Sequence, residues 1–483
     1  MAEVTRLIAI DLGADSGRVV LGMLTGGKLA MQVVHRFANT PQRVAGHLRW
    51  DIDALWRGIR EGLRLARTQA GGPVASIAVD TWGVDYALLD AAGNVLDQPI
   101  HYRDERTVGV PETVAQLVSA EEQFARTGTR GLIFNTAFQV FAEQRERPEL
   151  LKRAHRLITV PDLLGFWLSG TMANEWSNAG TSGLTIAGKP EWDRNLISEL
   201  GLPDHLFGPI VRSGADLGAM RPELAQELGF AERPRIIAPG CHDTASAVAA
   251  MPTAVPGTAF ISCGTWSLMG VLLTKPVTGA EAFASGLSNE IAVDGRIRLL
   301  KNIMGLWVWQ ECRRDLQGEG VELSHAELAA LATAAAPQGA VFDIDHPSLL
   351  VPSSAGERMI DRVRRLGGAL PMATPGELFR RITEALAAAY AKTRLDLEHI
   401  TGQPVRALSL MGGGCHNKLL CQLTADACGV PVLAGPDEGT ALGNLLVQAR
   451  SLGLVDDAGM AAVSAASSEI ASYTPGARVA AGR

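Results

Sequence analysis

The chain is poor in cysteine, in net charge and in long apolar runs, and each shortage excludes a class of protein. Its 483 residues contain six cysteines without regular spacing, which excludes a disulfide framework and indicates that most thiols are reduced. Lysine and arginine number 44 and aspartate and glutamate 51, a net charge of −7 without a basic run, so nucleic acid is not an expected partner.

A membrane or secretory role is excluded on similar grounds. The most apolar stretch, residues 258–273, is interrupted by glycine, serine and threonine and is too short to span a bilayer. Residues 1–6 lead directly into a strand pattern, which is not typical of a signal peptide. These features predict a soluble cytoplasmic protein without a membrane partner, and the chain length predicts two domains.

A recurring pattern of apolar, glycine-containing and apolar segments predicts β-hairpins. Residues 6–24 show it first, with the turn expected at residues 11–17. Residues 258–273 repeat the pattern, and residues 76–90 resemble a third case. Two hairpins of one kind, about half the chain apart, indicate two related halves.

The first half also contains one clear helix and one irregular region. Residues 51–70 carry apolar side chains at helical spacing, which predicts a helix capped by Asp53. Residues 160–239 are rich in glycine, proline, tryptophan and asparagine, which predicts either an insertion on the sugar side or a set of loops.

Helices and strands are expected to alternate in the C-terminal half. A long helix is expected to begin at Thr374-Pro375, where proline is tolerated in the first turn, and to end at Gly402. The elements expected after it are a strand at 405–411, a glycine turn at 412–414, a helix at 417–428, a strand at 430–434 and a last helix at 440–452. Such alternation favours an α/β fold with a mainly parallel sheet covered on its faces.

The segment 241–245, Cys-His-Asp-Thr-Ala, is the strongest functional signal. It follows an apolar run and Pro-Gly and leads into small residues, which places it at the carboxyl end of a strand, where open α/β sheets build their sites. Asp243 could there accept a proton from a hydroxyl group. A buried structural pair of His242 and Asp243 accounts for the same residues, whereas a metal site is disfavoured because no other His or Cys has ligand spacing to it.

The turn of the first hairpin is a candidate phosphate-binding loop. Its two glycines, at positions 13 and 17, would let successive N–H groups point into one concavity. Ser16 adds a hydroxyl group and Arg18 a positive charge, whereas Asp11 would repel phosphate unless a cation such as Mg²⁺ lay between them. A simple hairpin turn remains the alternative, and the charge of Asp15 counts against phosphate contact by that side chain.

Three further segments fit a nucleotide and a sugar. Thr265 lies in the turn of the second hairpin, and Gly412-Gly413-Gly414 lies between a strand and a helix whose N-terminal N–H groups are free. Trp82-Gly83 offers an aromatic wall and an open backbone, although a tryptophan in a core hairpin has the same pattern. The segment 183–189 has P-loop spacing, but Pro190 stands at the Ser/Thr position, so it is rejected as a Walker motif.

Taken in order, these segments resemble the FGGY family of carbohydrate kinases. The similarity runs to about residue 450. Residues 80–85 and 301–307 resemble most the branch of the family that acts on L-rhamnulose. The matching segments are 11–18, 80–85, 102–106, 134–136, 242–248, 264–270, 301–307 and 412–417.

The resemblance implies an α/β fold of two actin-like ATPase (ribonuclease H-like) domains flanking a catalytic cleft. Residues 1–248 would bind mainly the sugar and residues 249–465 mainly ATP, and residues 466–483 would form a flexible tail. The implied ligands are a small-molecule ketose and ATP with Mg²⁺, bound by a monomer or a homodimer.

The resemblance also implies a role for individual residues. Asp243 would be the catalytic base, and Asp11 would contact Mg²⁺ through water. The ketose-binding positions are Trp82, Gly83, His242, Asp243, Thr244 and Asn302. The ATP-binding positions are Ala14, Asp15, Ser16, Gly17, Arg18, Thr265, Gln310 and Gly413. The family has serine where this chain has Asp15, which leaves the nucleotide contacts of that loop open.

The implied reaction is transfer of the γ-phosphoryl group of ATP to the 1-hydroxyl of L-rhamnulose, giving L-rhamnulose 1-phosphate in L-rhamnose catabolism. A kinase of another ketose, such as L-fuculose or L-xylulose, is the first alternative, because pocket shape and not motif spacing decides the sugar. A non-catalytic actin-like ATPase and a sugar sensor are more remote alternatives.

Overall fold

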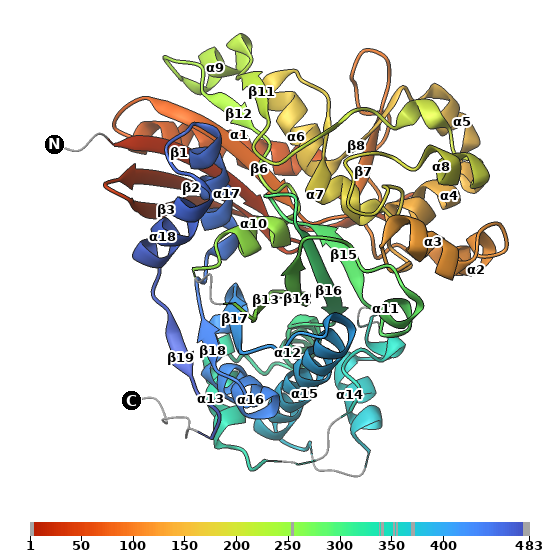
Figure 1. The fold of residues 1–483 in the computed structure, drawn as a ribbon, viewed down its shortest axis with the longest axis vertical. Coiled ribbons are helices and arrows are strands. Elements are labelled where there is room, and N and C mark those ends of the chain that lie inside the picture. The colour runs from red at the N-terminus through yellow and green to blue at the C-terminus, as the bar shows by residue number, and fades with distance from the viewer. Residues whose placement is uncertain are drawn as a thin grey trace. The chain divides into compact units, whose positions relative to one another are not determined.

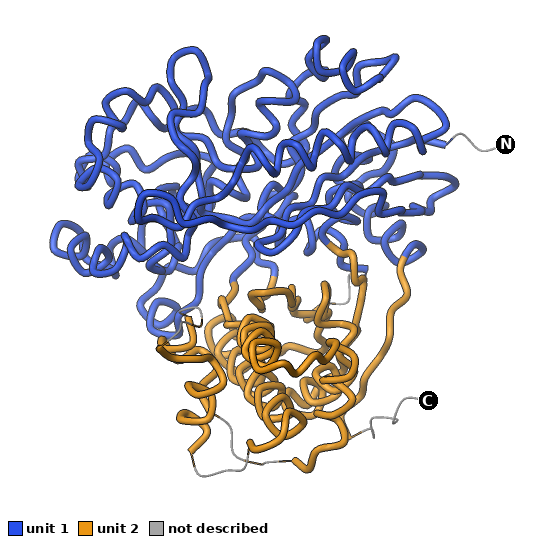
Figure 2. The backbone as a smooth tube through the Cα atoms, turned by 180° about the vertical axis from the view of Figure 1, so that it is seen from behind, with its two compact units in different colours: residues 1–252, 272–299, 440–467 blue, residues 253–271, 300–439, 468–483 orange. Residues whose placement is uncertain are grey.

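The computed structural model shows a chain of alternating strands and helices (Figure 1). Contacts between residues divide it into two compact units (Figure 2). Unit 1 comprises residues 1–252, 272–299 and 440–467, and unit 2 comprises residues 253–271, 300–439 and 468–483. The residues that the structure describes are 4–252, 256–337, 339, 342–350, 353, 356–368 and 372–476.

Unit 1 is built on a six-stranded sheet of order β11-β12-β6-β1-β2-β3 (Figure 1). Strands β1 and β2 form the predicted hairpin, with Leu12 opposite Gly17. β6 lies parallel to β1 and to β12. The strands are β1 (Thr5–Leu12), β2 (Ser16–Thr25), β3 (Lys28–Ala38), β6 (Val74–Thr81), β11 (Asp216–Ala219) and β12 (Arg235–Ile237).

Alternating side chains of β1 bury both faces of this sheet. Ile8 and Ile10 belong to the core that contains the helix α1 (Ile52–Gln69), which packs on β2 and β3. Leu7 and Ala9 point to the other face and belong to the core that contains α17 (Gly439–Ser451) and α18 (Asp457–Ser467). A strand buried on both faces reads as a continuous apolar run, as Leu-Ile-Ala-Ile does here.

The predicted helix at 51–70 is confirmed, but its cap was assigned to the wrong aspartate. Asp51 accepts a hydrogen bond from the N–H of Ala54 and caps α1, whereas Asp53 lies in the first turn. An aspartate just before the helix can reach a free N–H of the first turn, which makes Asp51 the capping position.

Two other expectations for unit 1 were wrong. Residues 76–90 do not form a hairpin, because β6 pairs with β1 and β12 while β7 (Tyr86–Leu89) pairs with β8 (Arg156–Thr159). Residues 160–239 are not only loops, since they contain α6 (Val160–Ser169), which packs on β6, as well as several shorter elements.

The remaining elements of unit 1 are short. Its strands are β4 (Gln42–Val44), β5 (His47–Arg49), β9 (Asn174–Glu175), β10 (Ile210–Val211) and β15 (Ser288–Ile291). Its helices are α2 (Val110–Val114), α3 (Ala120–Thr127), α4 (Thr136–Glu146), α5 (Pro148–Arg153), α7 (Trp176–Ala179), α8 (Arg194–Glu199), α9 (Pro222–Leu228), α10 (Asp243–Ala249) and α11 (Ala280–Ala284). Three 3₁₀ turns lie at Glu105–Thr107, Gly180–Ser182 and Asp204–Leu206.

The second sheet has seven strands in the order β15-β16-β14-β13-β17-β18-β19. The predicted hairpin at 258–273 is confirmed as β13 and β14, and β17 joins β13 in parallel. Both sheets are mixed, not mainly parallel, because each hairpin adds antiparallel pairs. The strands not yet given are β13 (Thr258–Cys263), β14 (Ser267–Leu273), β16 (Ile297–Ile303), β17 (Ala407–Met411), β18 (Val432–Ala434) and β19 (Ala471–Tyr473).

The long C-terminal helix, α15 (Pro375–Thr401), is confirmed, with proline in its first turn and Gly402 at its end with φ 65°. Thr374 and Glu377 also form a capping box at its start. The predicted helix at 417–428 corresponds to α16 (Lys418–Cys428), and that at 440–452 to α17. The other helical elements are α12 (Trp307–Gly318), α13 (His325–Ala334), α14 (Met359–Gly367) and the 3₁₀ turns Pro347–Leu349 and Gly413–His416.

The C-terminal end of the chain holds more structure than expected. α17 is not the last helix, because α18 follows it and ends at Ser467. Of the predicted tail 466–483, residues 471–473 form β19, which pairs with β18, and residues 477–483 lie outside the described part. Unit 2 is not a continuous part of the chain, because residues 272–299 and 440–467 pack within unit 1.

Two exclusions can be compared with the structure. All six cysteines lie among the described residues, and none of them forms a disulfide there. In the part of the chain that the structure describes, no helix combines the length and the apolar character that a membrane span needs.

Candidate active site

The segment 241–245 lies where the sequence placed it, because it follows β12 and its last three residues begin α10. The N–H of Thr81 at the end of β6 donates to the carbonyl of Cys241 at 2.9 Å, and α10 begins at Asp243. Gly240 is required just before, since a Cβ there would lie 2.9 Å from the N–H nitrogen of Ser246. The Pro-Gly segment therefore forms a turn that lies close to the first turn of α10.

Asp243 has the environment of a general base. Its Oδ1 accepts hydrogen bonds from the N–H (2.5 Å) and the hydroxyl (3.1 Å) of Thr244, and its side chain is 34% exposed. Burial, and next the nearby carboxylate of Asp11, raise the pKa of Asp243 above its ordinary value, against the opposing effects of His242 and Thr244. A carboxylate whose pKa is shifted towards neutrality is a stronger proton acceptor, and part of it stays open to a ligand.

His242 and Gly83 are brought together beside Asp243. The His242 side chain is 9% exposed, and its Nε2 lies 3.4 Å from Asp243 Oδ1. A Cβ on Gly83 would lie 3.4 Å from the His242 ring and 3.1 Å from the Thr181 hydroxyl. The absence of a side chain at position 83 therefore lets the backbone approach the imidazole.

Trp82 is placed differently from an exposed aromatic wall. It is 6% exposed, its ring centroid lies 4.1 Å from that of Trp50, and both indole N–H groups donate to Asp85, at 2.9 and 2.6 Å. Burial raises the pKa of Asp85 to about 6 despite hydrogen bonds from Gln139 and these two indoles. Asp85, which the sequence analysis did not assign to the site, fixes the orientation of the two rings.

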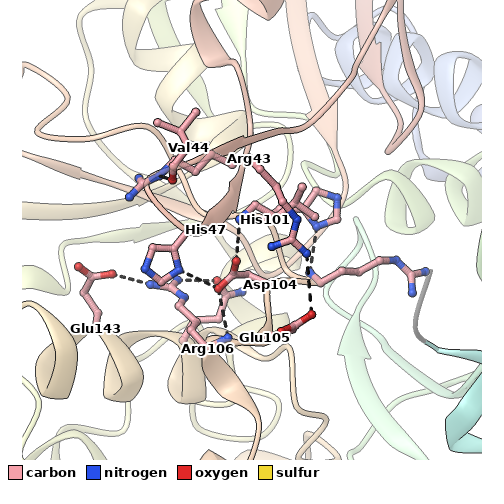
Figure 3. A network of polar contacts seen from close by, with 12 residues as sticks. Arg43, Val44, His47, His101, Asp104, Glu105, Arg106 and Glu143 are labelled. Carbon is pink, nitrogen blue, oxygen red and sulfur yellow. Dashed lines mark hydrogen bonds and ion pairs between the residues drawn. The ribbon is translucent and has the colours of Figure 1, made fainter. Parts of the chain in front are cut away.

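The segment 102–106 of the family resemblance also has a structural task. Asp104 accepts from the N–H of Leu48 at 2.7 Å and lies 3.0 Å from His47 Nδ1, which ties it to strand β5. Arg106 forms an ion pair with Glu143 on α4 in which both side chains are 2% exposed. Figure 3 shows how this network ties the β4–β5 hairpin to α4.

The turn of the first hairpin differs from the predicted nest. Neither of its glycines has a positive φ angle. A Cβ on Gly17 would lie 2.5 Å from the Phe37 ring, so packing accounts for that glycine. Arg18 donates to Asp11 at 2.9 and 2.6 Å. Of the predicted ATP-binding positions in this loop, Asp15 and Ser16 are exposed, Ala14 is half-buried and Gly17 is buried.

A third carboxylate, that of Asp80, was missed by the sequence analysis. Asp80 lies opposite Asp11 in the register of β6 and β1 and accepts from Asn444 on α17 at 2.5 Å. Burial, and next the charges of Asp11 and Asp243, raise its pKa well above the ordinary value. The sequence contains a pattern that could have identified Asp80, because Ile-Ala-Val-Asp at 77–80 repeats the Ile-Ala-Ile-Asp pattern at 8–11.

The donors at this edge of the sheet are of the kind that Mg²⁺ prefers. Magnesium is held by one or two carboxylates, substrate phosphates and water. Asp80 Oδ1 is buried and has no hydrogen-bond partner among the described residues. Those residues contain no cluster of three or more side chains arranged as a metal site. The carboxylates at this edge thus suit a Mg²⁺ ion that is held mainly by water and phosphate oxygens.

Three predicted nucleotide positions gather in unit 2. Thr265 lies in the turn between β13 and β14, and its carbonyl accepts from the N–H of Trp307 at the start of α12. Gln310 lies one turn further along this helix. A Cβ on Gly412, the residue before Gly413, would lie 3.0 Å from the carbonyl oxygen of Cys263, so the glycine turn lies against the end of β13. Asn302 lies near the end of β16 in the same unit.

Models of one family match almost the whole chain. The N-terminal domain of the FGGY family of carbohydrate kinases matches residues 6–250, and the C-terminal domain of that family matches residues 259–452. In terms of these models, the first domain ends with the segment that carries Asp243.

Curated relatives are similar over nearly their whole length. A rhamnulokinase of Bacteroides thetaiotaomicron is 38% identical over 468 residues, which cover 97% of this chain and 95% of that protein. A rhamnulokinase of Oceanobacillus iheyensis is 37% identical over 93% of this chain and 94% of its own length. A third, from Enterococcus faecalis, is 38% identical over 93% of this chain and 90% of its own length.

Solved structures share the fold at low sequence identity. The gluconate kinase of Lactobacillus acidophilus has a TM-score of 0.81 at 16% identity, covering 98% of this chain and 94% of its own. The xylulose kinase of Rhodospirillum rubrum has a TM-score of 0.76 at 21% identity, covering 97% and 94%. The predicted fold of actin-like ATPase domains and the predicted family are confirmed, and the chain belongs to the FGGY family of carbohydrate kinases.

Proposed function

We propose that this carbohydrate kinase transfers the γ-phosphoryl group of ATP to the 1-hydroxyl of L-rhamnulose, which yields L-rhamnulose 1-phosphate and ADP in L-rhamnose catabolism. The choice of sugar is supported by the relatives of 37–38% identity, which are rhamnulokinases. The observation that carries the reaction is the half-open position of Asp243, whose raised pKa suits a proton acceptor.

Asp243 is the base of the proposed mechanism. As the sugar oxygen forms its bond to the γ-phosphorus, its proton passes to Asp243 and the bond between that phosphorus and the β,γ-bridging oxygen breaks. Thr244 holds the carboxylate through two hydrogen bonds to Oδ1, which leaves Oδ2 for the substrate hydroxyl. Because phosphoryl transfer needs little covalent chemistry from the protein, this alignment provides most of the contribution of Asp243.

The other site positions complete the proposal. Trp82, Gly83, His242, Thr244 and Asn302 bind the ketose. Residues 14–18, Thr265, Gln310 and Gly413 bind ATP. When Mg²⁺ is bound through water at Asp11, it neutralises charge on the phosphates. The enzyme acts in the cytoplasm as a monomer or a homodimer.

A substrate screen tests the choice of sugar. ADP release is measured with L-rhamnulose, L-fuculose, L-xylulose, D-xylulose, L-ribulose and glycerol, and we expect the highest kcat/KM for L-rhamnulose. A higher value for L-fuculose or L-xylulose would transfer the proposal to that sugar. ATP hydrolysis that no ketose accelerates would instead favour an actin-like ATPase with a structural or chaperone role.

The variant Asp243→Asn tests the mechanism. A positioned general base contributes about 10²–10⁴-fold to the rate, so kcat should fall by that factor while ATP binding is retained. Asp216→Asn, which removes an exposed carboxylate of β11, is the control and should retain its activity. Near-normal turnover by Asp243→Asn would refute the assignment.

A further inference from the structure

The His242 imidazole is held between two carboxylates. On one side its Nε2 lies 3.4 Å from Asp243 Oδ1, and on the other its Nδ1 lies 3.2 Å from Glu290 Oε2. Glu290 is on β15 and its side chain is 7% exposed. Each ring nitrogen therefore lies within ion-pair distance of a carboxylate, and the two carboxylates come from different elements of unit 1.

Arg298 forms the other side of this arrangement. Its guanidinium group is fully buried, its Nη2 lies 3.0 Å from Glu290 Oε2 and 3.3 Å from His242 Nδ1, and its Nε donates to the carbonyl of Ile291 at 3.1 Å. Burial alone would raise the pKa of Glu290, but His242 and Arg298 hold it below its ordinary value. Glu290 is thus an ionised carboxylate whose charge faces the guanidinium group of Arg298.

Burying the ion pair of Glu290 and Arg298 has a large cost in desolvation free energy. Removing two charges from water costs several kcal/mol per ion, so a buried ion pair adds little net stability compared with apolar residues of the same size. The pair lies directly behind the ring that contacts the base. Its location next to Asp243 therefore suggests a role in the chemistry and not only in the packing of β15 and β16.

We propose that Glu290, together with Arg298, is a positioning residue for the catalytic base and acts through His242. Glu290 holds the Arg298 guanidinium group, which donates to His242 Nδ1 and fixes the plane of the imidazole ring, so that Nε2 faces Asp243 Oδ1 and Oδ2 remains directed to the sugar hydroxyl. The hydrogen bond at one ring nitrogen decides how the other can act, and here Nδ1 accepts that bond from Arg298, whose guanidinium group forms an ion pair with Glu290. This inference rests on the proposed role of Asp243.

A double-mutant cycle tests whether Glu290 acts through the base. The variant Glu290→Gln keeps the side-chain length and removes the charge, and we expect kcat to fall about 10²-fold, the scale of a misplaced catalytic group. In the background Asp243→Asn the same substitution should change kcat less than about threefold, because no base remains to be positioned. Single turnovers with excess enzyme make the slow reactions measurable.

A matched ion pair provides the control. Arg380 and Glu384 on α15 are 9% and 11% exposed and form an ion pair like that of Arg298 and Glu290. Removing one partner of a buried ion pair destabilises a fold, so both Glu290→Gln and Glu384→Gln should lower Tm, but Glu384→Gln should leave kcat unchanged. Glu290→Asp retains the charge beside Arg298 but is one methylene shorter, so it should fold like the wild type and lose kcat about tenfold, between wild type and Glu290→Gln.

The outcomes separate this inference from the proposed function. Equal losses of kcat in the two backgrounds would show that Glu290 acts only on structure, and wild-type kcat in both Glu290 variants would exclude any role. If Glu290→Gln does not fold, Glu290→Asp in both backgrounds decides the question in the same way. Normal turnover by Asp243→Asn would refute the base itself and the inference with it, which is a different result from a failed cycle.

Discussion

Gly443 on α17 offers the sharpest test of how the fold holds Asp243. α17 crosses α10 so closely that a Cβ at Gly443 would lie 1.7 Å from the carbonyl oxygen of Ser246. Ordinary contact begins near 3.4 Å, so Gly443→Ala must separate the two helices by about 1.7 Å. Asp243 is the first residue of α10, and the displacement would move it with the helix.

The cost follows from what prevents that separation. Leu442, Leu445 and Leu446 of α17 are fully buried, so the helix cannot move away without opening the core under the sheet. Overpacking of this kind costs about 3 kcal/mol, near the upper end of its usual range. In a unit of this size, that loss in the free energy of unfolding corresponds to a decrease in Tm of roughly 5 °C. A base displaced by more than an ångström should lower kcat about 10²-fold.

Thermal unfolding and steady-state ADP release measure both effects. Gly318→Ala at the end of α12 is the control, because a Cβ there would meet no heavy atom within 4 Å, and it should match the wild type in Tm and kcat. If Gly443→Ala also matches the wild type in both, the close contact between α10 and α17 does not determine the position of Asp243.

Two more predictions concern the buried acid and the nucleotide turn. Burial raises the pKa of Asp85 from 3.8 to about 6, so its ionisation costs stability above pH 6 and costs nothing below pH 4. The free energy of unfolding, measured with urea, should therefore fall between pH 4 and pH 7 by roughly 3 kcal/mol more in the wild type than in Asp85→Asn. An equal pH dependence in the two proteins would contradict the raised pKa. Thr265→Val should weaken ATP binding and leave ketose binding nearly unchanged in calorimetry, and the reverse pattern would reassign the hairpin turn.

Local signals in the sequence predicted the elements that local physics decides. Residues 374–402 show a capping threonine, a proline in the first turn and a terminal glycine, and the structure has that helix within one residue. The hairpins at 6–24 and 258–273 could be predicted because a glycine turn separates two apolar strands in each of them. The segment 76–90 has the same pattern, yet β6 and β7 join different sheets, and strand partners are a property of the whole fold.

The site was predictable only where its residues are neighbours in the sequence. His242 and Asp243 follow a strand and a turn, so their position at a sheet edge could be inferred. Glu290 and Arg298 contact His242 from β15 and β16, about 50 residues later in the chain. No sequence pattern at those two positions predicts this contact. Gly17 was assigned to a phosphate nest although the Phe37 ring is what excludes a side chain, since packing between β2 and β3 is not visible in the sequence.

The interleaved construction of unit 1 has a consequence for how the protein is made. The apolar face of β1 and β2 is covered by α17, whose Leu445 occupies the space above Gly22. On the ribosome, residues 1–252 emerge first, and about 190 residues must be translated before residues 440–467 complete unit 1. At a translation rate of roughly 5–20 residues per second, the nascent chain exposes this apolar sheet face for about 10–40 s. The chain is most prone to aggregation, and most dependent on chaperones, during this interval.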